Sequence, residues 1–210
     1  MKRGIITIII CALSFWTLPA RAELVTIQIT GEVDFVGDPY GYFEGKIKVG
    51  DIITGFYTYE STTPDSNPIP QVADYLHRAA PCGISLTVGG FEFKTDPASV
   101  NFLVEITNNY PPNDDYFLLS RNNIPLSNGT LIDEISWWLY DPTGNALSSD
   151  ALLITAPILD NWQSNSLGIH GPVRGNSFGI VAHVTSAVLI PELATILLFG
   201  LGLSLLRKRT

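Results

Sequence analysis

Two adjacent tryptophans, Trp137 and Trp138, are the residues of this chain best suited to bind a ligand. They lie in an apolar segment, 131–140, whose pattern predicts a β-strand, and neighbouring side chains of a strand point to opposite faces. One indole is therefore expected in the core and the other near solvent, where it can stack on a sugar ring, with Tyr140 beside it. The alternative is that both rings serve packing alone.

Side chains for hydrolytic or zinc chemistry are sparse. The three histidines are far apart, and neither His-x-x-x-His nor Cys-x-x-Cys occurs, so no zinc site is expected. Glycoside hydrolysis needs two carboxyl groups facing each other across a cleft. Asp133 and Glu134 are neighbours in an expected strand and so point apart, and Glu32 and Asp34 share a face that looks solvated. We predict no catalytic residue.

Two loops carry oxygen-rich side chains of the kind that calcium prefers. Their spacing departs from a calcium-binding loop, whose ligands alternate along the chain. Aspartate and asparagine in turns more often bond to their own backbone. We therefore predict no metal and no cofactor. The two groups are Asn113, Asp114 and Asp115, and Asp141, Asn145 and Asp150.

The segments that must position these residues alternate between apolar and polar side chains. In 25–35, for example, Val25, Ile27 and Ile29 alternate with Thr26 and Gln28, which is the period of a half-buried strand. No long stretch has a helical period, although 72–79 suits a helical turn or two. We expect an all-β fold, an antiparallel β-sandwich of the jelly-roll type, in residues 23–189. Its strands are expected at 25–35, 42–49, 52–59, 84–88, 91–94, 100–106, 116–120, 131–140 and 178–188.

The charge of this middle portion excludes one class of partner. Of the 12 basic and 20 acidic residues of the chain, only six basic residues but nineteen acidic ones lie between positions 23 and 191, a formal charge of −13. A surface this acidic repels phosphate backbones, so we predict no nucleic-acid partner.

The N-terminal segment, 1–22, has the three parts of an export signal. Lys2 and Arg3 precede an uncharged apolar stretch at 4–18, and Ala20 and Ala22 are the small residues before a cleavage site at Glu23. Removal of this segment takes Cys11 with it. The remaining thiol, Cys82, then has no partner for an internal disulfide.

The C-terminal segment, 190–210, joins an apolar stretch to a basic end. Residues 193–206 are uncharged. At about 1.5 Å per residue, a helix there would be shorter than the roughly 30 Å hydrocarbon core of a membrane. The basic residues predict that the end stays in the cytoplasm. They are Arg207, Lys208 and Arg209.

This tail resembles the PEP-CTERM sorting signal of Gram-negative bacteria. The matching parts are Pro191 and Glu192, the Leu/Gly-rich stretch 196–206 and the basic cluster, while Leu193 stands where the family usually has a second proline. The resemblance implies transient anchoring in the inner membrane, recognition by an exosortase, cleavage near the Pro-Glu pair and association with exopolysaccharide or biofilm. A plain membrane anchor is the alternative.

The segment from Gly55 to Tyr59, followed by Thr63-Pro64-Asp65, also resembles the uncharacterised β-rich ectodomains often joined to such tails. We therefore expect a non-enzymatic protein of the envelope or extracellular matrix, exported through the inner membrane and sorted to the cell surface. The alternatives are a carbohydrate-binding module and a secreted glycan-active enzyme.

Overall fold

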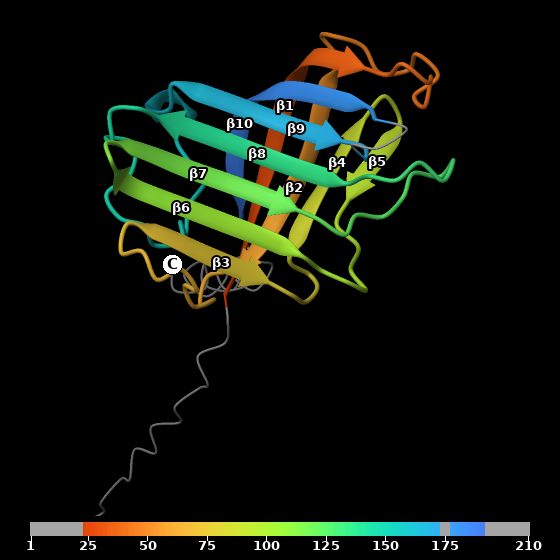
Figure 1. Cartoon of the computed structure of the whole chain (residues 1–210). Coiled ribbons are helices and arrows are strands. Elements are labelled where there is room, and N and C mark those ends of the chain that lie inside the picture. The colour runs from red at the N-terminus through yellow and green to blue at the C-terminus, as the bar shows by residue number, and fades with distance from the viewer. Residues whose placement is uncertain (1–22, 173–176, 192–210) are drawn as a thin grey trace, which may run out of the picture.

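A computed structural model describes residues 23–172 and 177–191, in which the chain forms ten strands and one short 3₁₀ turn (Figure 1). The residues of the expected export signal, Ala20 and Ala22 included, lie outside the described residues, as do Glu192, the apolar stretch and the basic cluster of the tail. The elements are β1 (Leu24–Gly37), β2 (Ile52–Glu60), β3 (Val72–His77), β4 (Gly83–Val88), β5 (Phe91–Lys94), β6 (Phe102–Tyr110), β7 (Asn113–Ser120), β8 (Glu134–Asp141), η1 (Leu159–Asn161), β9 (Ser164–His170) and β10 (Gly179–Ile190).

All strand pairs are antiparallel, in the order β3-β6-β7-β8-β9-β10-β1-β2-β4-β5. The all-β, antiparallel prediction is thus confirmed. The prediction of a jelly-roll sandwich with two separate sheets is not confirmed, because the ten strands form one open, curled sheet. Within the described residues, no helix is both long enough and apolar enough to cross a membrane.

The sheet curls because β1 and β10 are long, bent strands that belong to both of its halves. β1 breaks register between Thr30 and Gly31 and again between Val33 and Phe35, and such bulges bend a strand. A Cβ on Gly31 would lie 2.5 Å from the His183 carbonyl oxygen, so only glycine allows this close approach. The half-sheet β3-β6-β7-β8-β9 thereby folds over the half-sheet β2-β4-β5.

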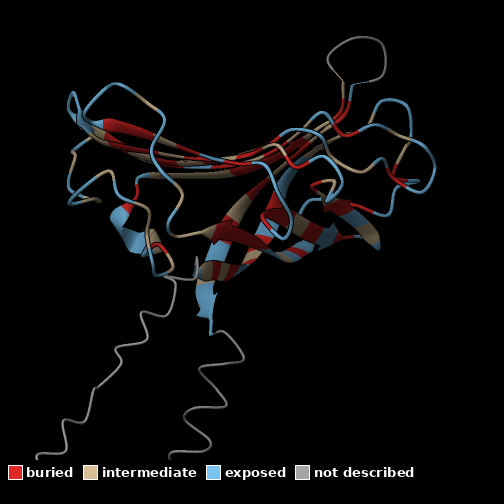
Figure 2. Ribbon diagram, turned by 90° about the horizontal axis from the view of Figure 1, so that it is seen from below, coloured by how far each residue is buried: buried red, intermediate tan, exposed pale blue. Residues whose placement is uncertain are grey.

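The core lies between these two halves, and Figure 2 shows the buried residues along the strands and the exposed ones mainly in loops. Tyr57 of β2 and Tyr116 of β7 meet across the core, with their hydroxyl oxygens 3.2 Å apart. Trp137 of β8 packs edge-on against both rings. The largest fully buried aromatic residues are Trp137, Tyr57, Tyr59, Tyr116, Phe43, Phe93 and Phe102.

Three expectations about individual segments were wrong. The expected strand at 42–49 is a looped connection, because the Asp38 carboxylate accepts the backbone N–H groups of Tyr42 and Phe43 and turns the chain. The segment 72–79 is mostly the edge strand β3, not a helical turn. β9 was missed, since its polar, glycine-containing sequence lacks clean alternation.

Candidate functional site

A shallow groove of about 410 Å³ lies on the outer face of β6–β9 and reaches Val181 of β10. This face of β6–β9 is turned toward the viewer in Figure 1. The groove is the place where the exposed tryptophan lies: Trp137 is fully buried, whereas Trp138 is 43% exposed. The prediction that the two indoles divide between core and solvent is confirmed. The groove is lined by Glu105, Asp115, Phe117, Ser136, Trp138, Ser166, Gly168, His170 and Val181.

Strand alternation and register place these side chains side by side. In β7 every second residue is buried, which leaves Asp115 and Phe117 on the outer face. Phe117 lies opposite Trp138 and Asp115 opposite Tyr140 in the pairing with β8. The rings of Trp138 and Tyr140 are 5.4 Å apart, so together they form an aromatic surface along β8.

The Trp138 ring is held in place although its face is open to solvent. Its Nε1 donates a hydrogen bond of 2.7 Å to Oδ1 of Asp115, and the other oxygen of Asp115 accepts a hydrogen bond from the Asn113 amide. A ring oriented in advance loses little conformational freedom on binding, which favours affinity. The arrangement therefore suits stacking against a flat, partly apolar ligand.

Gly168 leaves space in the groove floor. A Cβ at this position would lie 2.8 Å from Nε2 of His170 and 3.3 Å from Oγ of Ser136. Any side chain here would therefore displace the imidazole and fill part of the groove. The absence of a side chain keeps the surface next to Trp138 recessed.

The end of the groove nearest β3 is acidic. Glu105 lies directly opposite Asp74 in the register of β6 with β3. Burial raises the pKa of the Glu105 carboxyl, and the negative charges of Asp74 and Asp115 raise it further. Oδ1 of Asp74 is buried without a hydrogen-bond partner among the described residues. The carboxyl groups of Asp74, Glu105 and Asp115 thus gather at this end of the groove.

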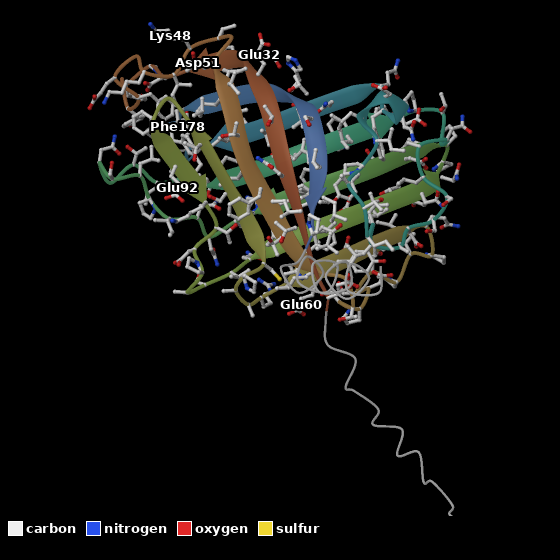
Figure 3. The ribbon with its side chains drawn as sticks, turned by 180° about the vertical axis from the view of Figure 1, so that it is seen from behind. Glu32, Lys48, Asp51, Glu60, Glu92 and Phe178 are labelled. Atoms are coloured by element: carbon white, nitrogen blue, oxygen red, sulfur yellow. The ribbon has the colours of Figure 1, made fainter. Side chains whose placement is uncertain are left out.

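A larger groove, of about 580 Å³, lies beside the β4–β5 hairpin on the other side of the molecule, where Figure 3 labels Glu92. Its lysines are already paired: Lys46 lies 2.6 Å from Glu44, and Lys94 lies 2.9 Å from Glu92. Lys46 also lies over the ring of Phe91. With its charges balanced and its aromatic ring covered, this groove is less suited to a ligand.

In the two oxygen-rich loops, buried carboxylates accept hydrogen bonds from backbone N–H groups. Asp114 accepts the N–H groups of Asn109 and Leu147. The N–H groups of Thr143 and Asn145 bond to Asp141 and lower the pKa of its carboxyl. Within residues 23–172 and 177–191, no three His, Cys, Asp or Glu side chains are grouped so as to hold a metal ion.

Two of the other carboxylates considered from the sequence form ion pairs and are not part of the groove lining. Glu134 lies 3.1 Å from Arg121, and Asp34 lies 2.8 Å from His183. Glu105 and Asp115, which the structure does bring together, were not singled out as a pair. The alternation of 100–106 indicated that Glu105 is on a polar face, but only the pairing of β6 with β7 makes it a neighbour of Asp115.

The chain also contains a sequence motif known from hydrolases that the sequence analysis did not identify. Residues 175–179 read Gly-Asn-Ser-Phe-Gly, which matches the Gly-x-Ser-x-Gly pattern of hydrolase nucleophiles. That chemistry requires a strand followed by a turn and a helix. Ser177 instead precedes the strand β10 in the connection from β9, so the pattern lacks its catalytic context.

Comparison of the chain with protein-family models, with curated proteins and with solved structures gives no match.

Proposed function

We propose that this protein is an exported component of the envelope or extracellular matrix, whose β domain binds a glycan in the groove on β6–β9. The observation that carries the proposal is the exposed, hydrogen-bonded Trp138 in a recessed surface. Sugar rings have apolar faces that stack on an indole and hydroxyl groups that donate hydrogen bonds to carboxylates. Glu105 and Asp115 supply carboxylate oxygens along the groove, and Ser166 supplies a hydroxyl oxygen.

Two features favour binding over hydrolysis of the glycan. Glu105 and Asp115 stand side by side on one sheet face, in diagonal positions of neighbouring strands, whereas a glycosidase places its carboxyl groups on opposite sides of the bond to be cut. Both oxygens of Asp115 accept side-chain hydrogen bonds. A carboxylate held in this way is better suited to orienting Trp138 than to attacking a sugar.

The sorting part of the proposal rests on the two terminal segments. β1 begins at Leu24, directly after the expected cleavage site before Glu23, and β10 ends at Ile190, directly before Pro191. Removal of both segments would therefore leave every strand of the sheet intact. This agreement supports cleavage at the two ends by signal peptidase and an exosortase-type peptidase, with brief anchoring in the inner membrane.

A jelly-roll-like sandwich remains part of the proposal for the fold. Its support is the packing of the inner faces of the two half-sheets through Tyr57 and Tyr116. Continuous pairing through β1 and β10 distinguishes the molecule from a sandwich with two separate sheets.

Replacement of Trp138 by alanine is expected to weaken glycan binding about tenfold or more, because tryptophans that become buried on binding dominate binding free energies. The measurement is retention of the mature exported protein on immobilised matrix polysaccharides, followed by titration with the ligand found. Phe56→Ala is the matched control, since Phe56 is 48% exposed but lies on the outer face of β2. Equal retention of Trp138→Ala and the wild type, or no retention of the wild type by any glycan, would contradict the proposal.

Deletion of residues 193–210 is expected to abolish membrane retention and C-terminal processing. The intact mass of the mature wild-type protein should correspond to a chain that starts at Glu23 and ends near Pro191, and cell fractionation should show the precursor in the inner membrane. Replacement of Arg207, Lys208 and Arg209 by serine tests the basic cluster separately. Unchanged fractionation and mass in the deletion variant would overturn the sorting proposal.

A further inference from the structure

We propose that the groove on β6–β9 selects glycans whose sugars carry ammonium groups, such as a de-N-acetylated amino-sugar polymer, over anionic glycans. This inference rests on the proposed function, because it names the class of glycan that the same groove would take. Its basis is the sign of the charges that line the groove, the position of one carboxylate at the edge of the stacking ring, and the absence of lysine and arginine from the lining within residues 23–172 and 177–191.

The charged groups of the groove are predominantly negative. Glu105 and Asp115 are the carboxylates of its lining, and Asp74 lies beside Glu105 on β3. Among the lining residues that the structure describes, His170 is the one basic side chain. Arg121, which follows β7, is paired with Glu134. A uronic acid or sulfated sugar would be repelled by the carboxylates of this lining.

The geometry places this charge where a stacked sugar presents its substituents. Oδ1 of Asp115 lies 2.7 Å from Nε1 at the edge of the Trp138 ring. A sugar lying flat on that ring therefore projects an equatorial substituent toward Asp115. An ammonium group at that position would gain an ion pair, whereas an N-acetyl group would offer only a neutral amide.

The second carboxyl group is within reach of the same ligand. Glu105 is diagonal to Asp115 across β6 and β7, a relation that separates side chains by roughly 7–8 Å. Ammonium groups on one oligosaccharide can therefore meet both residues. An approaching cation also favours the ionised form of Glu105, whose pKa is raised by burial and by the charges of Asp74 and Asp115 in the free protein.

The test compares three soluble probes at a mildly acidic pH that keeps amines protonated: a β-1,4-linked glucosamine oligosaccharide, its fully N-acetylated counterpart and an oligouronate of equal length. The glucosamine probe is expected to bind the mature protein roughly three- to tenfold more tightly than the N-acetylated one, the range that one or two partly exposed ion pairs provide. Added salt should reduce this ratio, because it screens charges near the surface. The oligouronate should bind least.

Asp115→Asn is expected to lower the affinity ratio between the glucosamine and N-acetylated probes, because only Glu105 then remains to pair with an ammonium group. Asparagine keeps an oxygen that can accept the Trp138 hydrogen bond, so the variant removes charge with little change in shape. Glu92→Gln is the matched control, since it removes one negative charge at the other groove, and it should leave the ratio unchanged. Ser166→Lys, which adds a cation to the groove, should weaken binding of the glucosamine probe relative to the oligouronate.

The outcomes separate this inference from the proposed function. Binding of the N-acetylated probe or the oligouronate through Trp138, with affinity equal to or above that of the glucosamine probe, overturns the charge selectivity and leaves glycan binding intact. An undiminished preference in Asp115→Asn also overturns it. Failure of all probes and of every matrix polysaccharide to bind overturns both.

Discussion

Trp137→Ala is expected to destabilise the domain by about 3–5 kcal/mol, the usual cost of removing a fully buried aromatic side chain. Trp137 has no solvent exposure and packs against Tyr57 and Tyr116, with ring centroids 5.8 and 6.1 Å away. Its Nε1 donates a 2.9 Å hydrogen bond to Asn165 on β9. Since domains are stable by only about 5–15 kcal/mol, this variant should be close to unfolding.

The measurement is urea denaturation followed by circular dichroism. Trp138→Ala is an unusually close control, because it removes the same side chain from the next residue of the same strand. Its ring is on the solvent side, so its free energy of unfolding should change by no more than about 1 kcal/mol. Equal destabilisation by the two substitutions would show that β8 does not divide its faces between core and groove in this way.

The free energy of unfolding is expected to fall as the pH is lowered from 6.5 toward 4, because of His77. Burial lowers the pKa of this imidazole from 6.5 to about 4. Its Nδ1 meets Oγ1 of Thr63, its Nε2 is buried without a partner, and Tyr59 and Phe102 flank the ring. Protonation therefore places a charge in the core.

The direction of the effect follows from which state takes up the proton. Between pH 6.5 and about 4, His77 binds a proton in the unfolded chain but not in the folded protein. Proton uptake therefore stabilises the unfolded chain, and the free energy of unfolding decreases as the pH falls. The effect is on the order of 2–3 kcal/mol. Below a pH of about 4 both states are protonated, and this contribution becomes constant.

Two carboxyl groups also affect how the free energy of unfolding depends on pH. Because the pKa of Asp141 is lowered in the folded protein, its stabilising contribution is lost only as the pH falls below the unfolded value of 3.8. This loss lies below most of the pH range in which His77 acts. The raised pKa of Glu105 changes stability in the opposite direction to His77. Glu105 adds to the free energy of unfolding below pH 4.5, and this contribution is lost as the pH rises through the pKa of the folded protein. It therefore offsets part of the His77 effect.

A variant isolates the histidine from these carboxyl groups. His77→Phe keeps an aromatic ring between Tyr59 and Phe102 and removes the titration, so its stability should change less than that of the wild type between pH 6.5 and 4. Thermal unfolding across this range is the measurement, and an unchanged slope in His77→Phe would refute the assignment.

The sequence predicted which face of a strand is buried, but it did not predict the order of the strands in the sheet. The alternation around Trp137 and Trp138 predicted which ring is buried, because successive side chains of a strand point to opposite faces whatever the strand pairs with. The same pattern misled at 42–49, where the Asp38 carboxylate bonds to backbone N–H groups and turns the chain. No pattern identified β9, which supplies Gly168 and His170 to the groove.

The sequence by itself determined the strand-rich character of the domain, its acidity, the division of the two indoles and the terminal segments on which the sorting proposal rests. These are properties of local spacing and composition. Only the tertiary structure decided that Glu105, Asp115, Trp138 and His170 share one groove, and that β1 and β10 bend to join two half-sheets. The reason is that pairing among four strands depends on contacts between residues far apart in the chain, and each strand's periodicity is compatible with many partners.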